Sequence, residues 1–475
     1  MTAPPANLQR DVSPTTPPER PPLTVAVMEA PGGLPLLGHL PRMVRAPHEY
    51  IQSLRAHGDI VRIRVGTSPV YVVTSPELIH QVLVARSDGF ERGRVFDKAT
   101  AAIGKGVIVT NGDFHLRQRR LLQPGFQRAR IHGYMETIHR QVDTQAARWT
   151  PGGRISLREE MHRFTLNAVT RTLFGANTEE GIATEIGDYI DAANAWVSHH
   201  TLLSSEFFER LPTPVNRAFV RKKARFDELI GAFIDARRAD ERDHGDLLSA
   251  LLAAQDAETG KGMSDEQLRI EIAGLFVAGS ETTATALSWL FHEVGKDPQV
   301  EARIQAEVDS VLGGRPVTAD DLPRLQYIQC VVSETLRLYP IAWLLMRRTL
   351  RDLELGGYHL PAGVEVLVSP IMSHRNPRIY PEPMRFDPDR WLPERARELP
   401  RYALLPFGDG KHKCIGDMFA RTEMVIAVAA IAARWRLVPV PGHRVWEVPR
   451  SVLRPNQVLM TTVPRTPHTP QETQS

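Results

Sequence analysis

The sequence predicts a mainly α-helical fold with a smaller β-rich part. Between Pro76 and Pro340 apolar residues recur every three or four positions, for example over 227–239 and 300–311, as in amphipathic helices. Short runs rich in valine and isoleucine, bounded by glycine and proline, lie on either side of this region and are typical of strands. The 475 residues show no internal repeat and no linker between folded halves, so we expect one domain over residues 31–463.

The two ends of the chain carry no pattern of packed structure. Residues 1–30 are rich in proline and polar side chains, which bury too little surface to become ordered. We expect a disordered tail there and another over residues 464–475. The start of the chain lacks the apolar core of a secretory signal, and the longest apolar stretch, residues 424–433, is half the roughly 20 residues that span a bilayer. A soluble, cytoplasmic protein without a membrane segment is expected.

Strand patterns near the N-terminus and after residue 340 predict the β-rich part. Residues 59–65 and 70–74 are rich in valine and isoleucine and are expected to form two neighbouring strands. Further along, residues 355–360 and 364–368 flank a Pro-Ala-Gly turn sequence at 361–363, which indicates a hairpin.

The clearest helix covers residues 264–295. Ser264 and Gln267 match a capping box at its start, and Pro298 lies just beyond its end. The helix would be about 48 Å long. Its centre, residues 270–277, is apolar nearly all round, as in a helix that crosses the middle of a large protein.

Charge and cysteine content exclude two classes of protein. The formal net charge is only +3, which is too weak to indicate binding to nucleic acid. The chain has two cysteines, Cys330 and Cys414, so a disulfide-stabilised framework is excluded. Two reduced thiols would be the ordinary interpretation in a cytosolic protein, and the surroundings of Cys414 argue against it.

A glycine-rich loop precedes a cysteine at the start of the last long helix, in the stretch Phe407-Gly-Asp-Gly410-Lys-His412-Lys-Cys414-Ile-Gly416. A helix N-terminus and basic neighbours both stabilise a thiolate. Glycine lets the backbone approach a flat ligand closely. A thiolate that accepts backbone N–H bonds is the ligand that an oxygenase-type haem iron needs, because it favours O–O cleavage.

This loop resembles the haem-binding loop of the cytochrome P450 superfamily, F-x-x-G-x-[R/H]-x-C-x-G. Phe407, Gly410, His412, Cys414 and Gly416 occupy its five constrained positions. The resemblance implies the cytochrome P450 fold, haem b as cofactor and Cys414 as the iron ligand. It extends over about residues 31–463, and several stretches are similar to soluble actinobacterial members that oxidise terpenes such as the sesquiterpene pentalenene.

A second motif lies in the centre of the long helix, where residues 278–283 (Ala-Gly-Ser-Glu-Thr-Thr) match the family's [A/G]-G-x-[D/E]-T-[T/S]. A helical threonine often only bonds back to the carbonyl four residues earlier. Glu281, however, needs a partner or a function in so apolar a helix. The resemblance implies that Gly279 opens a groove over the iron, that Thr282 holds dioxygen and its water, and that Glu281 supplies protons as the second catalytic residue.

Two further motifs imply a structural support for the haem loop. Glu334 and Arg337 match the family's E-x-x-R, a spacing that puts both on one helical face. Residues 383–386 match its P-x-R-F. The resemblance implies a buried triad of Glu334, Arg337 and Arg385, although such pairs are often ordinary surface ion pairs.

Haem carboxylates need cationic partners, and the resemblance implies a set of them. Arg119 lies in a run that matches the family's W-x-x-x-R, with His115 in place of the tryptophan. Arg347 matches the family's propionate arginine, and Arg348 beside it is the competing choice. His412 completes the set. Each of these could also be a solvated surface charge.

The segments that the family places above the haem are apolar, which predicts a hydrocarbon-like substrate. They are residues 92–110, Leu275, Phe276 and Ala278 of the long helix, and residues 341–345. A dry pocket binds its ligand by buried apolar area. A terpenoid of secondary metabolism, a sesquiterpene in particular, is expected; a polyketide, steroid or fatty acid stays open, and some of these residues could belong to the core.

Electrons must come from another protein, because the chain shows no flavin motif and two cysteines cannot hold an iron–sulfur cluster. We expect a monomeric enzyme served by O2, a ferredoxin and an NADPH-dependent ferredoxin reductase. Basic residues on the cysteine side of the haem would attract an acidic ferredoxin or merely aid solubility. They are Arg117, Arg120, Lys411, Lys413 and Arg421.

Two other functions remain open at this point. A peroxide-driven enzyme or an isomerase would keep the cysteine loop but have less need of the proton relay at Glu281 and Thr282. A haem sensor would need no turnover at all. The presence of the relay favours the monooxygenase.

Overall fold

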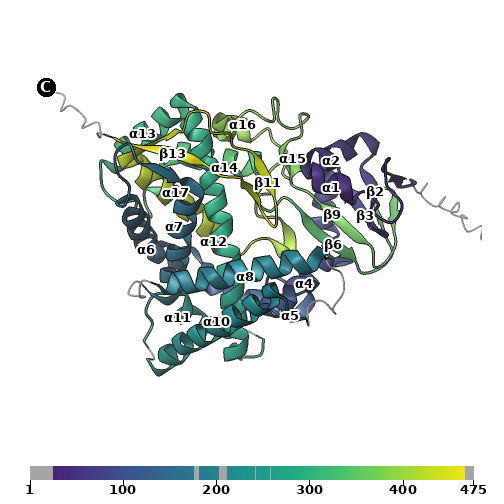
Figure 1. Ribbon diagram of the computed structural model, residues 1–475, viewed down its shortest axis with the longest axis horizontal. Helices are drawn as coiled ribbons and strands as arrows, with labels where there is room; N and C mark the ends of the chain where they lie inside the picture. The colour runs from purple at the N-terminus through teal and green to yellow at the C-terminus, as the bar shows by residue number, and fades with distance from the viewer. Residues whose placement is uncertain (1–24, 176–180, 203–210, 241, 257, 466–475) are drawn as a thin grey trace, which may run out of the picture.

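The computed structural model describes residues 25–175, 181–202, 211–240, 242–256 and 258–465. Helices make up most of the molecule, and the main β-sheet lies at one side, on the right of Figure 1. A large hydrophobic cluster joins the helices, and a smaller one lies against the main sheet. Within the described ranges, no helix combines the length and apolar character needed to cross a membrane.

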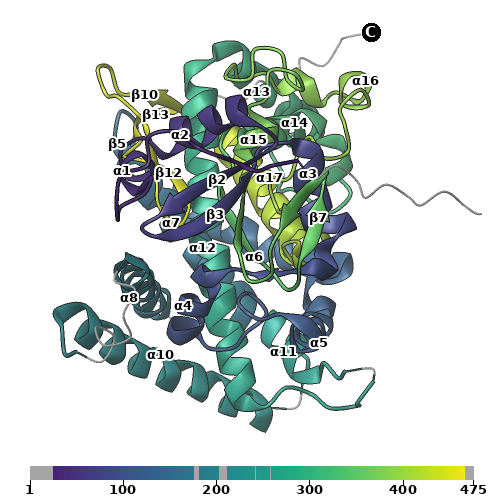
Figure 2. The ribbon, with the colours of Figure 1, turned by 90° about the vertical axis from the view of Figure 1, so that its right-hand side faces the viewer.

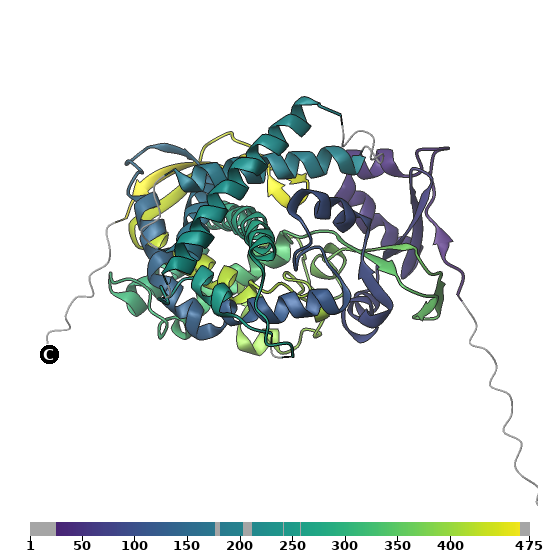
Figure 3. The same cartoon turned by 90° about the horizontal axis from the view of Figure 1, so that it is seen from below.

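The long central helix, α12 (Asp265–Lys296), confirms the sequence expectation. Figure 3 looks nearly along it and shows it end-on near the middle of the molecule. The Ser264 hydroxyl accepts the N–H of Gln267 at 3.2 Å, as in a capping box. The Gln267 side chain does not return that bond and instead donates to the carbonyl of Lys105 at 3.1 Å.

Several of the other helices contact α12. They are α4, α7, α8, α10, α13, α14 and α17, and the contact with α7 is the most extensive. The bounds of the longer helices are α4 (Arg94–Ile103), α5 (Gly112–Leu122), α6 (Arg128–Ala146), α7 (Leu157–Phe174), α8 (Ile182–Leu202), α10 (Pro214–Ala239), α13 (Pro298–Leu312), α14 (Gln326–Leu338) and α17 (Asp417–Arg434). The shorter ones are α1 (Leu40–Arg45), α2 (Pro47–Ser53), α3 (Pro76–His80), α11 (Leu247–Ala253), α15 (Ile371–His374) and α16 (Pro393–Ala396).

The main sheet has the order β1-β2-β3-β9-β6-β4. Its strands are β1 (Met28–Glu29), β2 (Ile60–Val65), β3 (Ser68–Val73), β9 (Glu365–Val368), β6 (Leu345–Thr349) and β4 (Phe90–Arg92). Strands β2 and β3 pair antiparallel, from Ile60 with Val73 to Val65 with Ser68, and confirm the first two expected strands. The remaining strands are β5 (Arg154–Ser156), β10 (Trp435–Pro439), β11 (Glu447–Pro449), β12 (Leu453–Pro455) and β13 (Leu459–Pro464).

The hairpin expected from residues 355–360 and 364–368 is wrong. The hairpin instead joins β7 (Leu353–Leu355) to β8 (Tyr358–Leu360), through Gly356 and Gly357. Both glycines have positive φ, 58° and 82°, as a two-residue type I′ turn requires. Strand β9 lies in the main sheet instead, between β3 and β6.

The ordered chain begins earlier than residue 31. Strand β1 pairs in parallel with β2, and the N–H of Val25 donates to the carbonyl of Gly357 at 2.8 Å. The ends 1–24 and 466–475 lie outside the described residues, so their expected disorder stays a prediction.

Candidate functional site

The cysteine loop is closed by bonds and contacts that require glycine. Cys414 lies between a single 3₁₀ turn, Gly410–His412, and α17. Its N–H donates to the carbonyl of Phe407 at 2.9 Å. Gly410 has φ +68°, and a Cβ there would overlap the carbonyl oxygen of Leu83. The loop therefore packs backbone to backbone against the helical turn that contains Leu83.

Cys414 is deep in the molecule and yet accessible. Burial raises the pKa of its thiol, outweighing the Gly416 N–H and the nearby charges of Arg119 and Lys413, which lower it. We expected those groups to stabilise a thiolate by themselves; in the protein alone they do not overcome desolvation. An accessible side chain in such a place lines an internal hollow, and its thiolate form needs a stronger positive partner, such as a metal ion.

One face of α12 is also accessible, although the helix crosses the middle of the molecule. Ala278 is exposed, and Leu275, Gly279 and Thr282 are half-buried, while most of their neighbours on the other faces are buried. These four positions recur every three or four residues, so they share one side of the helix. From this exposure in the middle of the molecule we infer a hollow beside the centre of α12.

Glu281 and Thr282 point to different surroundings. The Thr282 hydroxyl donates to the carbonyl of Ala278 at 2.7 Å, as the simple structural interpretation predicted. The Glu281 carboxylate accepts from the Asn194 amide at 3.1 Å and lies 3.9 Å from the Arg454 guanidinium. Glu281 thus faces α8 and β12, and any proton that passes between Glu281 and Thr282 needs a bridging group such as water.

A cluster of cationic side chains gathers beside the cysteine loop, and none of the described carboxylates is bonded to Arg92, Arg119 or Arg347. Arg92 donates to the carbonyls of Thr110 and Val107, both at 3.3 Å. Arg347 donates to the carbonyl of Met346, and Arg119 to that of Lys413. Burial, together with mutual repulsion, lowers the pKa of Arg92 to about 9, and burial lowers that of Arg347 to about 10.

His412 lies in this cluster without a hydrogen-bond partner among the described residues. Both of its ring nitrogens are buried. Burial, with repulsion from Arg92, Arg347, His115 and Lys411, lowers its pKa to about 2. A buried imidazole without a hydrogen-bond partner, among arginines that no described carboxylate pairs with, fits a ligand that carries carboxylates. The haem propionates implied by the sequence have this chemistry.

Arg347 and Arg348 have different environments. Arg348 lies on the other side of β6 and forms ion pairs with Glu91, Asp97 and Glu365 at 3.4, 2.7 and 3.0 Å. Arg347 is 5% exposed and has no carboxylate partner among its described contacts. Of the two, Arg347 is the one available to a ligand in the cluster.

His115 is turned toward backbone carbonyls. Its Nδ1 lies 3.0 Å from the carbonyl of Val107, and its Nε2 lies 3.2 Å from that of Lys411. Its ring centre is 4.5 Å from that of His412. His115 therefore holds the cysteine loop and His412 in place, and its contact with a haem carboxylate stays a prediction.

The expected triad of Glu334, Arg337 and Arg385 is wrong in its third member. Arg337 forms a bidentate pair with Glu334, both bonds at 2.8 Å, and both side chains are fully buried. Arg385 is exposed and pairs with Glu382; only its backbone carbonyl reaches Arg337. Arg390 is the buried third cation, 3.4 Å from Glu334. Glu334 can hold a second arginine because its carboxylate faces the segment just beyond residue 386.

Two of the five residues of the expected basic patch, Arg120 and Lys413, are paired with carboxylates. Arg120 pairs with Asp256 and Glu258, both at 3.1 Å. Lys413 pairs with Asp417 at 2.5 Å, and Arg421 lies over the Phe407 ring at 5.1 Å. Of the five basic residues, the remaining two are Lys411, which donates to the Phe90 carbonyl, and Arg117, which is half-buried. A surface hollow of about 310 Å³ lies along α5, beside Leu116, Arg119, Arg120 and Gln123.

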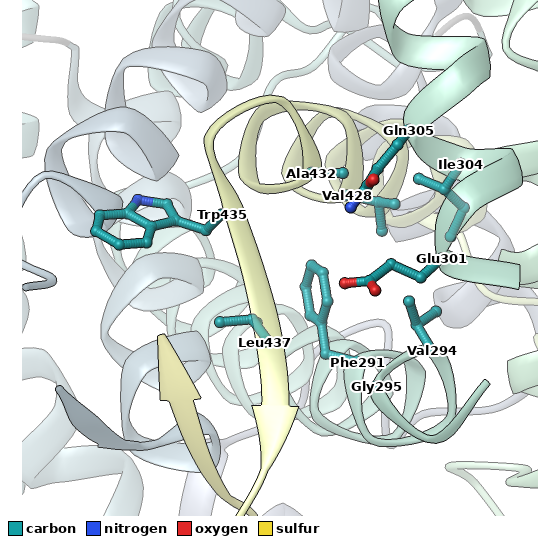
Figure 4. Close-up of a pocket in the computed structure, with 10 residues that line it drawn as sticks. All are labelled: Phe291, Val294, Gly295, Glu301, Ile304, Gln305, Val428, Ala432, Trp435 and Leu437. Atoms are coloured by element: carbon teal, nitrogen blue, oxygen red, sulfur yellow. The ribbon is translucent and has the colours of Figure 1, made fainter. Parts of the chain in front are cut away.

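A small internal cavity lies elsewhere, between the C-terminal part of α12, α13, α17 and β10. Figure 4 shows its wall, which is mostly apolar, with Glu301 and Gln305 reaching in from α13. Its volume of about 20 Å³ has room for little more than one water molecule. It is a packing defect rather than a substrate site.

Sequence reasoning missed Arg92 as a member of the cationic cluster. Arg92 ends β4, and it reaches the cluster because β4 pairs with β6, which brings Arg92 opposite Arg347. That pairing joins segments about 250 residues apart in the sequence, and no local pattern predicts it.

Comparison with known proteins gives consistent matches. The family model described as Cytochrome P450 matches residues 28–464. The chain is 43% identical to cyclooctat-9-en-7-ol 5-monooxygenase of Streptomyces melanosporofaciens, over 90% of this chain and 92% of that one. It is 38% identical to pentalenene oxygenase of Streptomyces avermitilis, over 92% and 97% of the two chains. The crystal structure of the cytochrome P450DA heme domain matches with a TM-score of 0.83 at 25% identity, covering 94% and 99% of the two chains.

Proposed function

The chain belongs to the cytochrome P450 family, and from this premise we propose that it oxidises a terpenoid hydrocarbon with O2 and electrons from a ferredoxin. As a member it is a haem-thiolate monooxygenase with protoporphyrin IX haem as cofactor. The observation that carries the proposal is one constellation: accessible Cys414 in a glycine-closed loop, the cationic cluster beside it, and the accessible apolar face of α12.

The residues present fit the cofactor. Cys414 would ligand the iron, and Arg92, Arg119, Arg347 and His412 would hold the two carboxylates. This assignment gives the unpartnered nitrogens of His412 an acceptor and the buried arginines a counter-charge. When bound, haem supplies an iron whose thiolate ligand favours cleavage of the O–O bond.

The side chains of α12 would deliver protons to the hollow. The Thr282 hydroxyl lies on the accessible face, so a rotation away from the Ala278 carbonyl lets it donate into the hollow. Glu281 lies beside it and contacts Asn194 and Arg454, which lead away from the hollow. We assign Thr282 as the proton donor and Glu281 as the group that restores its proton through water.

An apolar substrate follows from the walls of the hollow. Leu275 and Ala278 of α12 offer no hydrogen-bonding side chain, and neither does the half-buried Ile108. Such walls bind a ligand by apolar area and shape. Two relatives are named for cyclooctat-9-en-7-ol and for pentalenene, and these names support a cyclic terpenoid as the substrate.

The electron donor is proposed to be a ferredoxin that docks at the surface hollow on α5. This surface hollow lies along the helix whose Arg119 reaches the carbonyl of Lys413, next to Cys414. Because Arg120 and Lys413 are paired with carboxylates, the attraction should be weaker than a free basic patch would give.

The test compares electron sources and substrates. The purified holoenzyme is incubated with a panel of cyclic terpenes, either with NADPH, a surrogate ferredoxin and its reductase, or with hydrogen peroxide alone. We expect a substrate-induced shift of the haem spectrum with at least one terpene and product only in the ferredoxin arm, containing oxygen from labelled O2. Equal product with peroxide alone would favour the peroxide-driven alternative, and no spectral shift with any terpene would refute the substrate class.

A further inference from the structure

Glu271 is a buried acid that the proposed reaction does not use. It lies on α12 and is 1% exposed. It stands four residues before Leu275 and seven before Ala278, so it shares the face that borders the hollow. Its carboxylate accepts the backbone N–H of Val107 through both oxygens, at 3.2 and 3.0 Å, and the amide of Gln267 at 2.8 Å.

The partner of Glu271 belongs to a segment without helix or strand, residues 104–110, between α4 and α5. Figure 2 shows these two helices on either side of the lower part of α12. The segment lies close to α12 because glycine stands at each contact. A Cβ on Gly104 would lie 2.7 Å from Ile270, one on Gly106 3.1 Å from the Glu271 carboxylate, and one on Gly274 3.1 Å from Ile108.

Val107 is held from its other side by the cationic cluster. Its carbonyl oxygen is 3.0 Å from Nδ1 of His115 and accepts from Arg92 at 3.3 Å. His115 in turn reaches the carbonyl of Lys411 in the cysteine loop at 3.2 Å. One peptide segment thus connects α12, through Glu271, to the residues that would hold the haem carboxylates.

We propose that Glu271 is a positioning residue that holds segment 104–110 against α12 and thereby sets the wall of the substrate hollow and the placement of Arg92 and His115. The statement about substrate rests on the proposed function; the statement about the segment does not. Ile108 is the wall residue concerned, because it packs on Gly274 and remains half-buried.

Two physical points support this role. Burial raises the pKa of Glu271 to about 7, while the bonds from Val107 and Gln267 lower it. A protonated carboxyl keeps a carbonyl oxygen, so Glu271 can accept the Val107 N–H in either form. An apolar substrate has no hydrogen bonds to orient it, so its position depends on where the walls stand.

The experiment uses the holoenzyme with Glu271→Gln and Glu271→Leu, and Glu266→Gln as a matched control, an exposed glutamate on the same helix. The glutamine side chain keeps one oxygen that can accept the Val107 N–H, but it loses the oxygen that accepts the Gln267 amide. The leucine side chain accepts neither bond. Without substrate, we expect hydrogen–deuterium exchange over residues 104–110 to speed up on the order of tenfold in the glutamine variant and more in the leucine variant. The control should match the wild type.

Substrate binding gives the second measurement. With a terpene that shifts the wild-type haem spectrum, we expect both variants to need several-fold more ligand for half the shift and to raise KM more than they lower kcat. Unchanged exchange over residues 104–110 in the glutamine variant would overturn the proposal, even if the leucine variant fails to fold. Faster exchange with unchanged binding would remove the role in the pocket wall. The exchange result stands even if no terpene binds, so it is separate from the proposed function.

Discussion

Cys414 and Cys330 are the matched pair that tests the iron ligand. Cys414 is accessible in the glycine-closed loop, whereas Cys330 is buried in α14, where burial raises the pKa of its thiol to about 11. We expect Cys414→Ser to abolish the strongly red-shifted absorption of the reduced carbon monoxide complex, because a hydroxyl is not a thiolate ligand. Cys330→Ser should keep that absorption. A normal spectrum in the Cys414 variant would remove the basis of the assigned site.

Thr282 can be separated from an ordinary helical hydroxyl. Ser288, on the same helix, also bonds back to the carbonyl four residues earlier, at 2.7 Å, but is fully buried. We expect Thr282→Ala to keep substrate binding while product per NADPH falls by roughly tenfold or more, since a positioned proton donor contributes about 10²–10⁴-fold. The lost electrons should appear as hydrogen peroxide. Ser288→Ala should leave this ratio unchanged, and an equally coupled Thr282 variant would refute the proton-delivery role.

At single residues, the sequence identified the type of side chain better than its partner. Cys414, Arg119, Arg347 and His412 all lie by the candidate site, because a contiguous motif or a family position marked each of them. The P-x-R-F motif at residues 383–386 predicts Arg385 as the buried arginine, although Arg390 fills that role. Which of two arginines turns inward depends on where the chain bends, and that is decided by tertiary contacts.

The contacts of α14 allow a test of whether Arg390 or Arg385 is the buried third cation. Glu334 of α14 receives Arg337, Arg390, the Trp391 indole N–H at 3.0 Å and the Asp387 N–H at 2.9 Å. Removing one partner of a buried carboxylate costs about 3–5 kcal/mol, whereas an exposed ion pair is worth about 0–1 kcal/mol. We therefore expect Arg390→Ala to lower holoenzyme yield and melting temperature sharply, and Arg385→Ala to change them little. A larger effect of Arg385→Ala than of Arg390→Ala would support the triad of Glu334, Arg337 and Arg385.

Elements with a local signal were predicted, and those defined by distant pairing were not. Helix α12 and strands β2 and β3 follow from capping, apolar spacing and alternation, all of which are properties of adjacent residues. The β7–β8 hairpin was missed because Gly356-Gly357, a type I′ turn sequence, was assigned to the interior of a strand. Strand β9 could not be placed, since its neighbours β3 and β6 are chosen by the packing of the sheet.

At the scale of the whole molecule, the chain encloses its site between the cysteine loop, α12 and the segment between α4 and α5. Each part comes from a different third of the sequence, and each was recognised by its own motif or by its apolar composition. The hollow they share is inferred from the accessible Cys414, from Ala278 and from the half-buried residues beside Ala278 on α12. The sequence thus predicted the chemistry of the site, and tertiary structure was needed to show the cationic cluster and the contact of Glu271.

Global stability should decrease with pH above neutrality because of a second buried acid. Glu423 of α17 is fully buried beside the Thr283 hydroxyl, and burial raises the pKa of its carboxyl to about 8. The folded state therefore keeps a proton that the unfolded state releases above about pH 4.5. Its stabilising contribution is complete below that pH and is lost as pH rises toward 8. Buried histidines such as His374 and His412, whose pKa values are lowered, act below pH 6.5. In the window from 6.5 to 8.5 Glu423 dominates, and Glu271, whose pKa is raised to about 7 by burial, adds a smaller decline at the lower end.

In that window Glu423 should account for a loss of about 2 kcal/mol, from roughly 1.5 pKa units at about 1.4 kcal/mol each. The measurement is the unfolding free energy or melting temperature of the holoenzyme at pH 6.5, 7.5 and 8.5. We expect Glu423→Gln to flatten the decline, because its amide does not titrate, while Glu266→Gln, at an exposed position of α12, should keep the wild-type slope. The slopes of stability against pH are compared, and not the absolute stabilities, because the buried amide of the Glu423→Gln variant changes hydrogen bonding at every pH. Parallel declines in all three proteins would show that Glu423 titrates alike in the folded and unfolded states.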